Sequence, residues 1–159
     1  MKKTTFYIVL VSLFVFSCSR KESNVAIFVH SLDKDSVQNM LLDIDKKALI
    51  YSFDYSQPKD TIKNLSLKYN PKKEVLIYDL DTFFSIKNTF NSKSYEFKMY
   101  QTKEIKSHKK TLVFNTDYGL FATLSFGSDF LFLKDSISKS DSNIIFKGII
   151  LELNKINID

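Results

Sequence analysis

The sequence predicts a mainly β protein: a single antiparallel β domain, folded as a sandwich or a curled sheet, with at most one short helix near residues 36–45. Three observations lead to this fold class. About eight short segments alternate apolar and polar residues and follow one another at nearly regular spacing. Turn-forming residues separate them, and only one segment places apolar residues at helical spacing. The 159 residues include one cysteine, so a hydrophobic core rather than a disulfide framework must hold the domain together.

The first part of the domain contains the one segment whose period is ambiguous. A compact apolar run at 25–29 is expected to be the first strand. Residues 36–45 are expected to form the short helix, because their apolar residues recur at i, i+3, i+4 and i+7, namely Val37, Met40, Leu41 and Ile44. A strand over 40–44 that turns at 45–47 is the alternative. From residue 48 the period becomes two, and the clearest strand is 49–56.

The later strands are expected in close succession, at 65–69, 75–80, 95–100, 112–118, 120–126 and 129–133. Gly127 and Ser128 predict a two-residue hairpin loop between the last two of these strands. The polar segment 134–143 is expected to be a loop. Residues 144–153 are expected to be the last strand, with a bulge or a close approach at Gly148.

The N-terminus has the layout of an export signal. Lys2 and Lys3 precede an apolar segment, residues 6–16, which is too short to cross a bilayer and has the length of the apolar part of a signal peptide. The segment ends at Val15-Phe16-Ser17-Cys18, and the chain then turns polar. It resembles the signal peptide of bacterial lipoproteins, in which an aliphatic residue stands three positions before the cysteine and a small residue directly before it.

This resemblance implies how the chain is divided. Residues 1–17 would be a signal peptide cleaved between Ser17 and Cys18, and residues 18–24 the lipidated cysteine and a polar tether. Residues 25–153 would then be the β-rich globular domain, followed by a tail at 154–159 that is expected to fray.

The resemblance also implies a location in the cell envelope. The Cys18 thiol would carry diacylglycerol, with fatty acids such as palmitate, and two or more acyl chains hold a protein stably on a membrane. Ser19 stands where an aspartate would indicate retention in the inner membrane, which favours the outer membrane if the source is Gram-negative. A secreted soluble protein is the alternative.

The charge pattern favours a solvated surface over a nucleic-acid interface. The whole chain has a net charge of +5, and removing Lys2 and Lys3 with the signal peptide leaves 21 basic and 18 acidic residues, a net charge of +3. The basic residues are spread along the chain, and Arg20 is the only arginine among them. Proteins that read phosphates or bases usually carry arginine forks, so no nucleic-acid partner is expected.

Catalytic chemistry has few candidates in this sequence. None of the common catalytic or phosphate-binding motifs is present, and His30 and His108 are the only histidines. Acidic residues are spaced at i and i+2 in three pairs, Asp33/Asp35, Asp43/Asp45 and Asp79/Asp81. On a strand such a pair shares one face, so Asp79 and Asp81 are candidates for acid–base chemistry or for a hard cation. An exposed strand end is the alternative.

The aromatic residues offer either a ligand groove or a core. The candidates for a groove are Tyr51, Phe53, Tyr55, Tyr95, Phe97, Tyr100 and Tyr118. Tyrosine suits a binding surface because it is rigid, apolar and carries a polar tip. Core packing is favoured, because a chain without tryptophan must build its interior from Phe, Tyr, Ile and Leu.

The sequence therefore predicts a lipid-anchored envelope protein whose β domain binds or scaffolds a partner and is not an enzyme. The membrane, through the lipid on Cys18, is one expected partner, and an envelope protein or glycan is another. No cofactor or metal is expected. One alternative is an envelope hydrolase or metal-dependent enzyme that uses Asp79 and Asp81 with a histidine. The other is a carrier that holds an apolar ligand between curled strands.

Overall fold

The computed structural model describes residues 20–34, 36–58, 64–91, 95–103, 110–125 and 128–156. These residues form ten strands and one helix. The strands are β1 (Arg20–Ser31), β2 (Ser36–Lys46), β3 (Tyr51–Ser56), β4 (Leu65–Asn70), β5 (Val75–Tyr78), β6 (Asp81–Asn91), β7 (Glu96–Gln101), β8 (Thr111–Asn115), β9 (Gly119–Leu124) and β10 (Phe130–Lys134). The helix is α2 (Lys139–Ile156).

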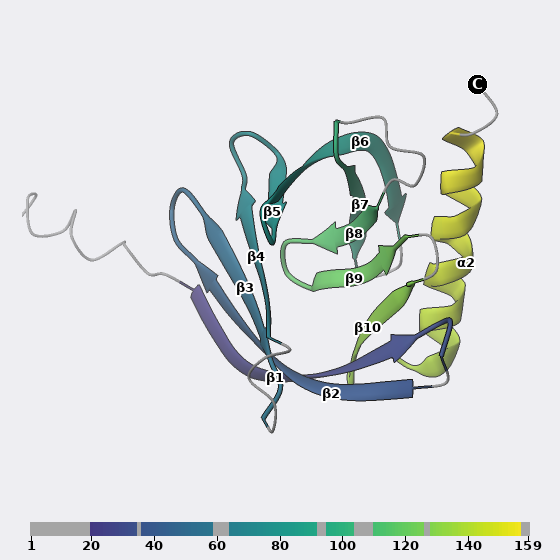
Figure 1. Ribbon diagram of the computed structural model, residues 1–159, viewed down its shortest axis with the longest axis horizontal. Helices are drawn as coiled ribbons and strands as arrows, with labels where there is room; N and C mark the ends of the chain where they lie inside the picture. Colours follow the sequence, from purple (N-terminus) through teal and green to yellow (C-terminus); the bar gives the residue numbers. More distant parts are fainter. Residues whose placement is uncertain are drawn as a thin grey trace, which may run out of the picture.

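The strands close into a barrel in which each strand pairs antiparallel with the next one along the chain (Figure 1). Strand β10 returns to β1 and completes the ring, with Ser31 opposite Phe130 and Ile27 opposite Lys134. The mainly β, antiparallel prediction is confirmed. Closure makes the architecture more specific than a sandwich or a curled sheet, and it removes the unpaired edges that an open sheet would expose.

The order of strands gives the barrel two distinct ends. At one end, which we call the cavity end because a pocket opens there, β1 turns into β2 and β5 turns into β6. At the entry end, the chain enters β1, and β2 turns into β3. Alternate side chains of each strand point inward, so the interior is filled largely by aliphatic and aromatic residues. Its fully buried aromatic members are Phe53, Tyr55, Phe83, Tyr100 and Phe114.

A second core lies outside the barrel, between its outer surface and α2. The helix packs on the side of the barrel that includes β6 (Figure 1). Ile145 and Ile149 of the helix are buried in it together with Phe97, Tyr118 and Phe121. Five of the seven predicted groove aromatics, Phe53, Tyr55, Phe97, Tyr100 and Tyr118, are thus core residues. Tyr51 and Tyr95 are partly buried against the two cores. Within the described ranges, no helix is long and apolar enough to cross a membrane.

The helix predicted at 36–45 is wrong, because these residues form most of strand β2. Met40, Leu42 and Ile44 are buried in alternation and face the barrel interior. The segment fits both patterns because Leu41 and Leu42 are adjacent. Leu41 completes the helical spacing, whereas Leu42 completes the alternation of Met40, Leu42 and Ile44 on one face of a strand. Pairing with both β1 and β3 then decides in favour of the strand.

The strand predicted at 144–153 is also wrong, because these residues lie within α2, which begins in the predicted loop 134–143. The Ser138 hydroxyl accepts the Asp141 N–H (3.1 Å) and donates to the Asp141 carboxylate (2.7 Å), which caps the first turn of the helix. Gly148 forms no strand bulge; it lies in this helix, where the Phe90 side chain approaches so closely that a Cβ would overlap the ring.

Other boundaries differ from the predicted ones. Strand β1 begins at Arg20, within the expected tether, and α2 runs to Ile156, within the expected tail. Strand β6 was not predicted; its register shifts between Ser85 and Thr89, which interrupts its alternation. Strands β9 and β10 pair as a hairpin, as predicted, but residues 126–127 of its loop lie outside the described residues.

Candidate ligand cavity at one end of the barrel

The barrel has a half-open pocket at its cavity end, with a volume of about 240 Å³. Six strands and the segment between β9 and β10 contribute its lining: Val29, Gln38, Met40, Leu65, Tyr78, Thr123, Ser125, Ser128, Phe130 and Phe132, with Lys110 just before β8. A ring of ten strands is wide enough to leave such a space above a packed interior. The cavity is therefore a direct product of barrel closure.

The cavity has an apolar wall and a polar rim. Val29, Met40 and Phe132 are buried and also belong to the interior core, so they form the floor. Gln38, Ser125 and Ser128 lie toward the turns and bring amide and hydroxyl groups to the lining. Apolar walls with a few polar groups are the usual composition of small-molecule sites.

Hydrogen bonds hold the β9–β10 side of the rim in place. The Ser125 and Ser128 hydroxyls lie 2.8 Å apart, and the Ser125 N–H donates to Asp129 Oδ1 (2.7 Å). The Asp129 N–H in turn donates to Asp33 Oδ2 (2.9 Å) in the turn between β1 and β2. Asp33, a member of one predicted acidic pair, thus links the β1–β2 turn to the segment between β9 and β10. Its partner in that pair, Asp35, lies outside the described residues.

Among the described residues that line this cavity, Lys110 alone carries a formal charge. Its ammonium nitrogen lies 3.9 Å from the centre of the Tyr78 ring, a cation–π contact. Burial lowers the pKa of Lys110 below its usual value, whereas the negative charges of Asp79 and Asp81 act in the opposite direction. Lys110 was not predicted as a site residue, because nothing in the residues around it along the chain marks it as part of a site.

The Asp79/Asp81 pair lies in the turn between β5 and β6. Tyr78 pairs with Asp81 across this turn, and Asp79 adopts a left-handed backbone conformation with φ of 54°. Both carboxylates are exposed to solvent and contribute to the field at Lys110. His30 lies on β1, five strands away from β6 around the ring, so the structure does not bring this histidine and the pair together. His108 lies outside the described residues.

The third acidic pair has structural partners. Asp43 accepts the Asn24 N–H (2.7 Å), which supports the irregular start of β1, and Asp45 forms an ion pair with Lys47 (2.8 Å). Among the described residues, no group of three or more His, Cys, Asp or Glu side chains is placed to hold a metal ion.

Charged side chains occupy the opposite, entry end of the barrel. The Lys134 ammonium donates to the Asp117 carbonyl (3.1 Å) and lies 5.0 Å from the centre of the Tyr118 ring. Lys46 forms an ion pair with the Asp117 carboxylate. Lys134 is only 8% exposed, and burial lowers its pKa. Aromatic rings and these lysines line the interior of this end, which also holds a smaller pocket of about 170 Å³ beside Tyr69, Tyr100 and Phe114.

Comparisons with protein-family models, with curated proteins and with solved structures find no match. The chemistry of the cavity itself is then the basis for a functional interpretation. Ser17 and Cys18, the predicted cleavage and lipidation residues, lie outside the described residues.

Proposed function

We propose that this chain is a lipid-anchored protein of the cell envelope whose barrel binds a small, largely apolar ligand and catalyses no reaction. The cavity at one end of the barrel is the observation that carries the proposal. Of the possible partners considered from the sequence, it favours a ligand held inside the barrel over a protein or glycan held on its surface.

The size of the cavity limits the size of the ligand. Its volume of about 240 Å³ exceeds the roughly 150 Å³ of an engineered apolar cavity that binds benzene. It is smaller than the roughly 300–1,000 Å³ of pockets that bind drug-sized molecules. A single ring with substituents, or a short aliphatic chain, has the right size.

The lining also indicates the chemistry of the ligand. Val29, Met40 and Phe132 favour an apolar body, which gains free energy when its surface leaves water. Lys110, at the rim, favours a carboxylate or another acceptor group at one end of that body. The ligand class we propose is a short-chain or aromatic carboxylic acid.

Ligand binding can be tested with a blocked cavity. Gln38 and Asn39 are neighbours on β2; Gln38 lines the cavity and Asn39 is exposed. Octanoic, decanoic and benzoic acids would be titrated by calorimetry into the chain from Ser19 onward, which includes every described element. We expect Gln38→Trp to weaken binding tenfold or more and Asn39→Trp to leave it unchanged. Equal losses in both variants, or no binding by the unmodified chain, would contradict the proposal.

The anchor rests on the Val15-Phe16-Ser17-Cys18 motif. We expect Cys18→Ala to abolish incorporation of a labelled fatty acid and to leave the uncleaved precursor, whereas Ser19→Ala should be processed and labelled normally. Fatty-acid labelling that persists in Cys18→Ala would refute the lipid anchor. In a Gram-negative source, Ser19 favours the outer membrane as the site of anchoring.

A further inference from the structure

We propose that the barrel rests on the bilayer through the turn between β2 and β3, so that its cavity opens away from the membrane. This orientation rests on the proposed lipid anchor and deepens it, because it assigns the residues beside the anchor that contact lipid. The proposed partner is the surface of a bilayer that contains anionic lipid.

The chain enters the barrel at the end where β2 turns into β3. Arg20 pairs with Lys46 and Lys21 with Asp45, so the start of β1 lies beside the end of β2. Cys18 is two residues before Arg20. At about 3.3 Å per residue, a chain of two residues places Cys18 no farther than roughly 7 Å from Arg20. A lipid on Cys18 would therefore hold this end of the barrel directly at the membrane surface, without a long tether.

The adjacent turn exposes apolar side chains to solvent. Residues 47–50 connect β2 to β3, and within them Leu49 is 60% and Ile50 43% exposed. Figure 1 shows this turn on the same side of the molecule as the start of β1, away from α2. Two neighbouring apolar side chains at the tip of a hairpin have no partner in water, whereas the interfacial region of a bilayer would bury them.

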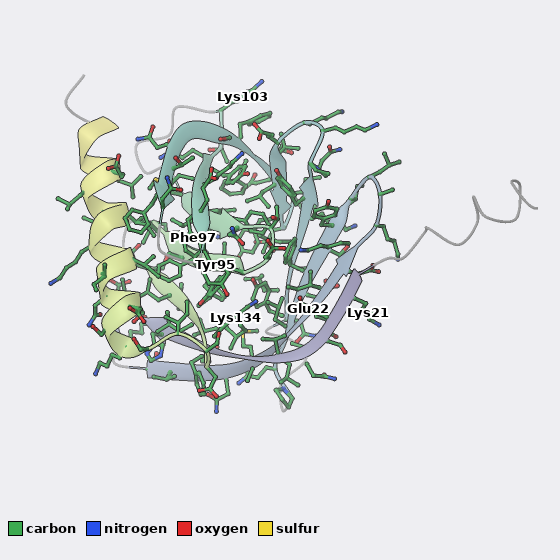
Figure 2. The ribbon with its side chains drawn as sticks, turned by 180° about the vertical axis from the view of Figure 1, so that it is seen from behind. Lys21, Glu22, Tyr95, Phe97, Lys103 and Lys134 are labelled. Atoms are coloured by element: carbon green, nitrogen blue, oxygen red, sulfur yellow. The ribbon has the colours of Figure 1, made fainter. Side chains whose placement is uncertain are left out.

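The charges around this turn are compatible with an anionic surface. Lys21 and Lys47 are exposed, and Figure 2 shows Lys21 at the start of β1. Asp45, paired with Lys47, and Glu22 carry the opposite charge and reduce the attraction. The apolar pair is therefore expected to provide most of the contact, with the lysines adding a dependence on salt.

The opposite end of the barrel offers a matched comparison. Leu80 is 100% exposed in the turn between β5 and β6, beside the cavity. It is also an apolar residue at the tip of a hairpin, but it is at the end of the barrel away from Cys18. If the anchor decides the orientation, Leu80 remains in water, and the cavity exchanges its ligand with the aqueous compartment rather than with the supporting membrane.

Single tryptophans can report which end meets lipid, because the chain has none of its own. Leu49→Trp and Leu80→Trp would be placed in the chain from Cys18 onward. Each protein would be coupled through its only thiol to a maleimide lipid in phosphatidylcholine–phosphatidylglycerol vesicles. This coupling supplies the anchor chemically, so that the orientation is tested even if the native acylation fails.

We expect the emission of Leu49→Trp to shift to the blue and to be quenched by brominated lipid. The emission of Leu80→Trp should stay red-shifted and be quenched by aqueous acrylamide. Lipid quenching of Leu80→Trp, or aqueous exposure of both tryptophans, would overturn the proposed orientation. Loss of fatty-acid labelling at Cys18 in cells would instead overturn the anchor alone.

Discussion

The Tyr118 hydroxyl links strand β10 to the rest of the barrel at the place where β9 and β10 part. It donates to the Phe132 carbonyl (2.8 Å) and accepts the Lys134 N–H (3.0 Å). Strands β9 and β10 pair in register only at Thr123 with Phe130 and at Ala122 with Leu131. On the β9 side, the Leu120 N–H donates to the Tyr55 hydroxyl (2.7 Å). Two tyrosine hydroxyls thus replace backbone hydrogen bonds that the strands no longer give each other.

We expect Tyr118→Phe to lower the free energy of unfolding by about 1–3 kcal/mol, because it leaves a buried carbonyl and a buried N–H without their partner while keeping the ring. Urea denaturation measures the change. Tyr51→Phe is the control, since Tyr51 is only partly buried and contacts Tyr69 through its ring. A loss of stability in Tyr118→Phe no larger than in the control would show that the junction of β9 and β10 does not depend on this hydroxyl.

Gly148→Ala should destabilise the protein even though alanine favours helices by about 1 kcal/mol over glycine. The new Cβ would overlap the Phe90 ring, so the ring or the helix must move, at a cost of about 1–3 kcal/mol. In the Phe90→Leu background the same substitution should be tolerated. Lys147→Ala, on the exposed side of α2, serves as the control in urea denaturation. A stabilising Gly148→Ala in the unmodified background would contradict the packing of α2 on β6.

The buried tyrosines predict a loss of stability at alkaline pH. Burial raises the pKa of Tyr55, Tyr100 and Tyr118 above the ordinary value of about 10. In the unfolded chain these phenols ionise first, so their contribution to stability is complete below pH 10 and is lost as pH rises above it. Ultraviolet titration of tyrosinate should therefore show one group of phenols near pH 10 and another that ionises only as the fold is lost. A single transition near pH 10, with the fold intact, would be inconsistent with the burial of these side chains.

Lys110 should determine whether the cavity prefers acids to alcohols. We expect Lys110→Met to weaken binding of octanoic acid and to leave binding of octanol nearly unchanged, because only the acid loses a charged partner. Burial holds the pKa of Lys110 below its usual value of 10.5, so the preference of the unmodified chain for the acid should decline as pH rises toward that value. Calorimetric titration at several pH values measures both effects. An equal loss for acid and alcohol would assign Lys110 a structural role only.

The parts of the fold that were predictable from the sequence are those whose local pattern has one explanation. Residues 51–56 alternate strictly and form β3 with Phe53 and Tyr55 buried, whereas Leu49 and Ile50, which were predicted to begin this strand, lie in the turn before it. In β2, the adjacent Leu41 and Leu42 satisfy both a helical and a strand period, so only the pairing with β1 and β3 decides. In α2, nearly continuous apolar residues hide the helical spacing of Ile145 and Ile149, although Ser138 and Asp141 carry a capping signal in the sequence.

The candidate cavity was not predictable in the same way. Val29 and Phe132 become neighbours because β1 pairs with β10, and no feature of the sequence specifies a contact between segments so far apart. Lys110 and Tyr78 meet for a similar reason, since they come from opposite sides of a long stretch of intervening chain. By contrast, the acidic pairs were visible in the sequence, but the structure uses Asp33 and Asp43 to hold turns and strands.

The two methionines that follow Cys18 in the sequence test the central claim most directly. Met40 lines the cavity, whereas Met99 is buried in the outer core with Phe97. In the chain from Ser19 onward, labelled with ¹³C at the methionine methyl groups, titration with octanoic acid should shift the Met40 methyl resonance and leave that of Met99 in place. If both resonances stay unchanged at saturating ligand, or if only that of Met99 moves, the barrel does not bind its ligand in this cavity.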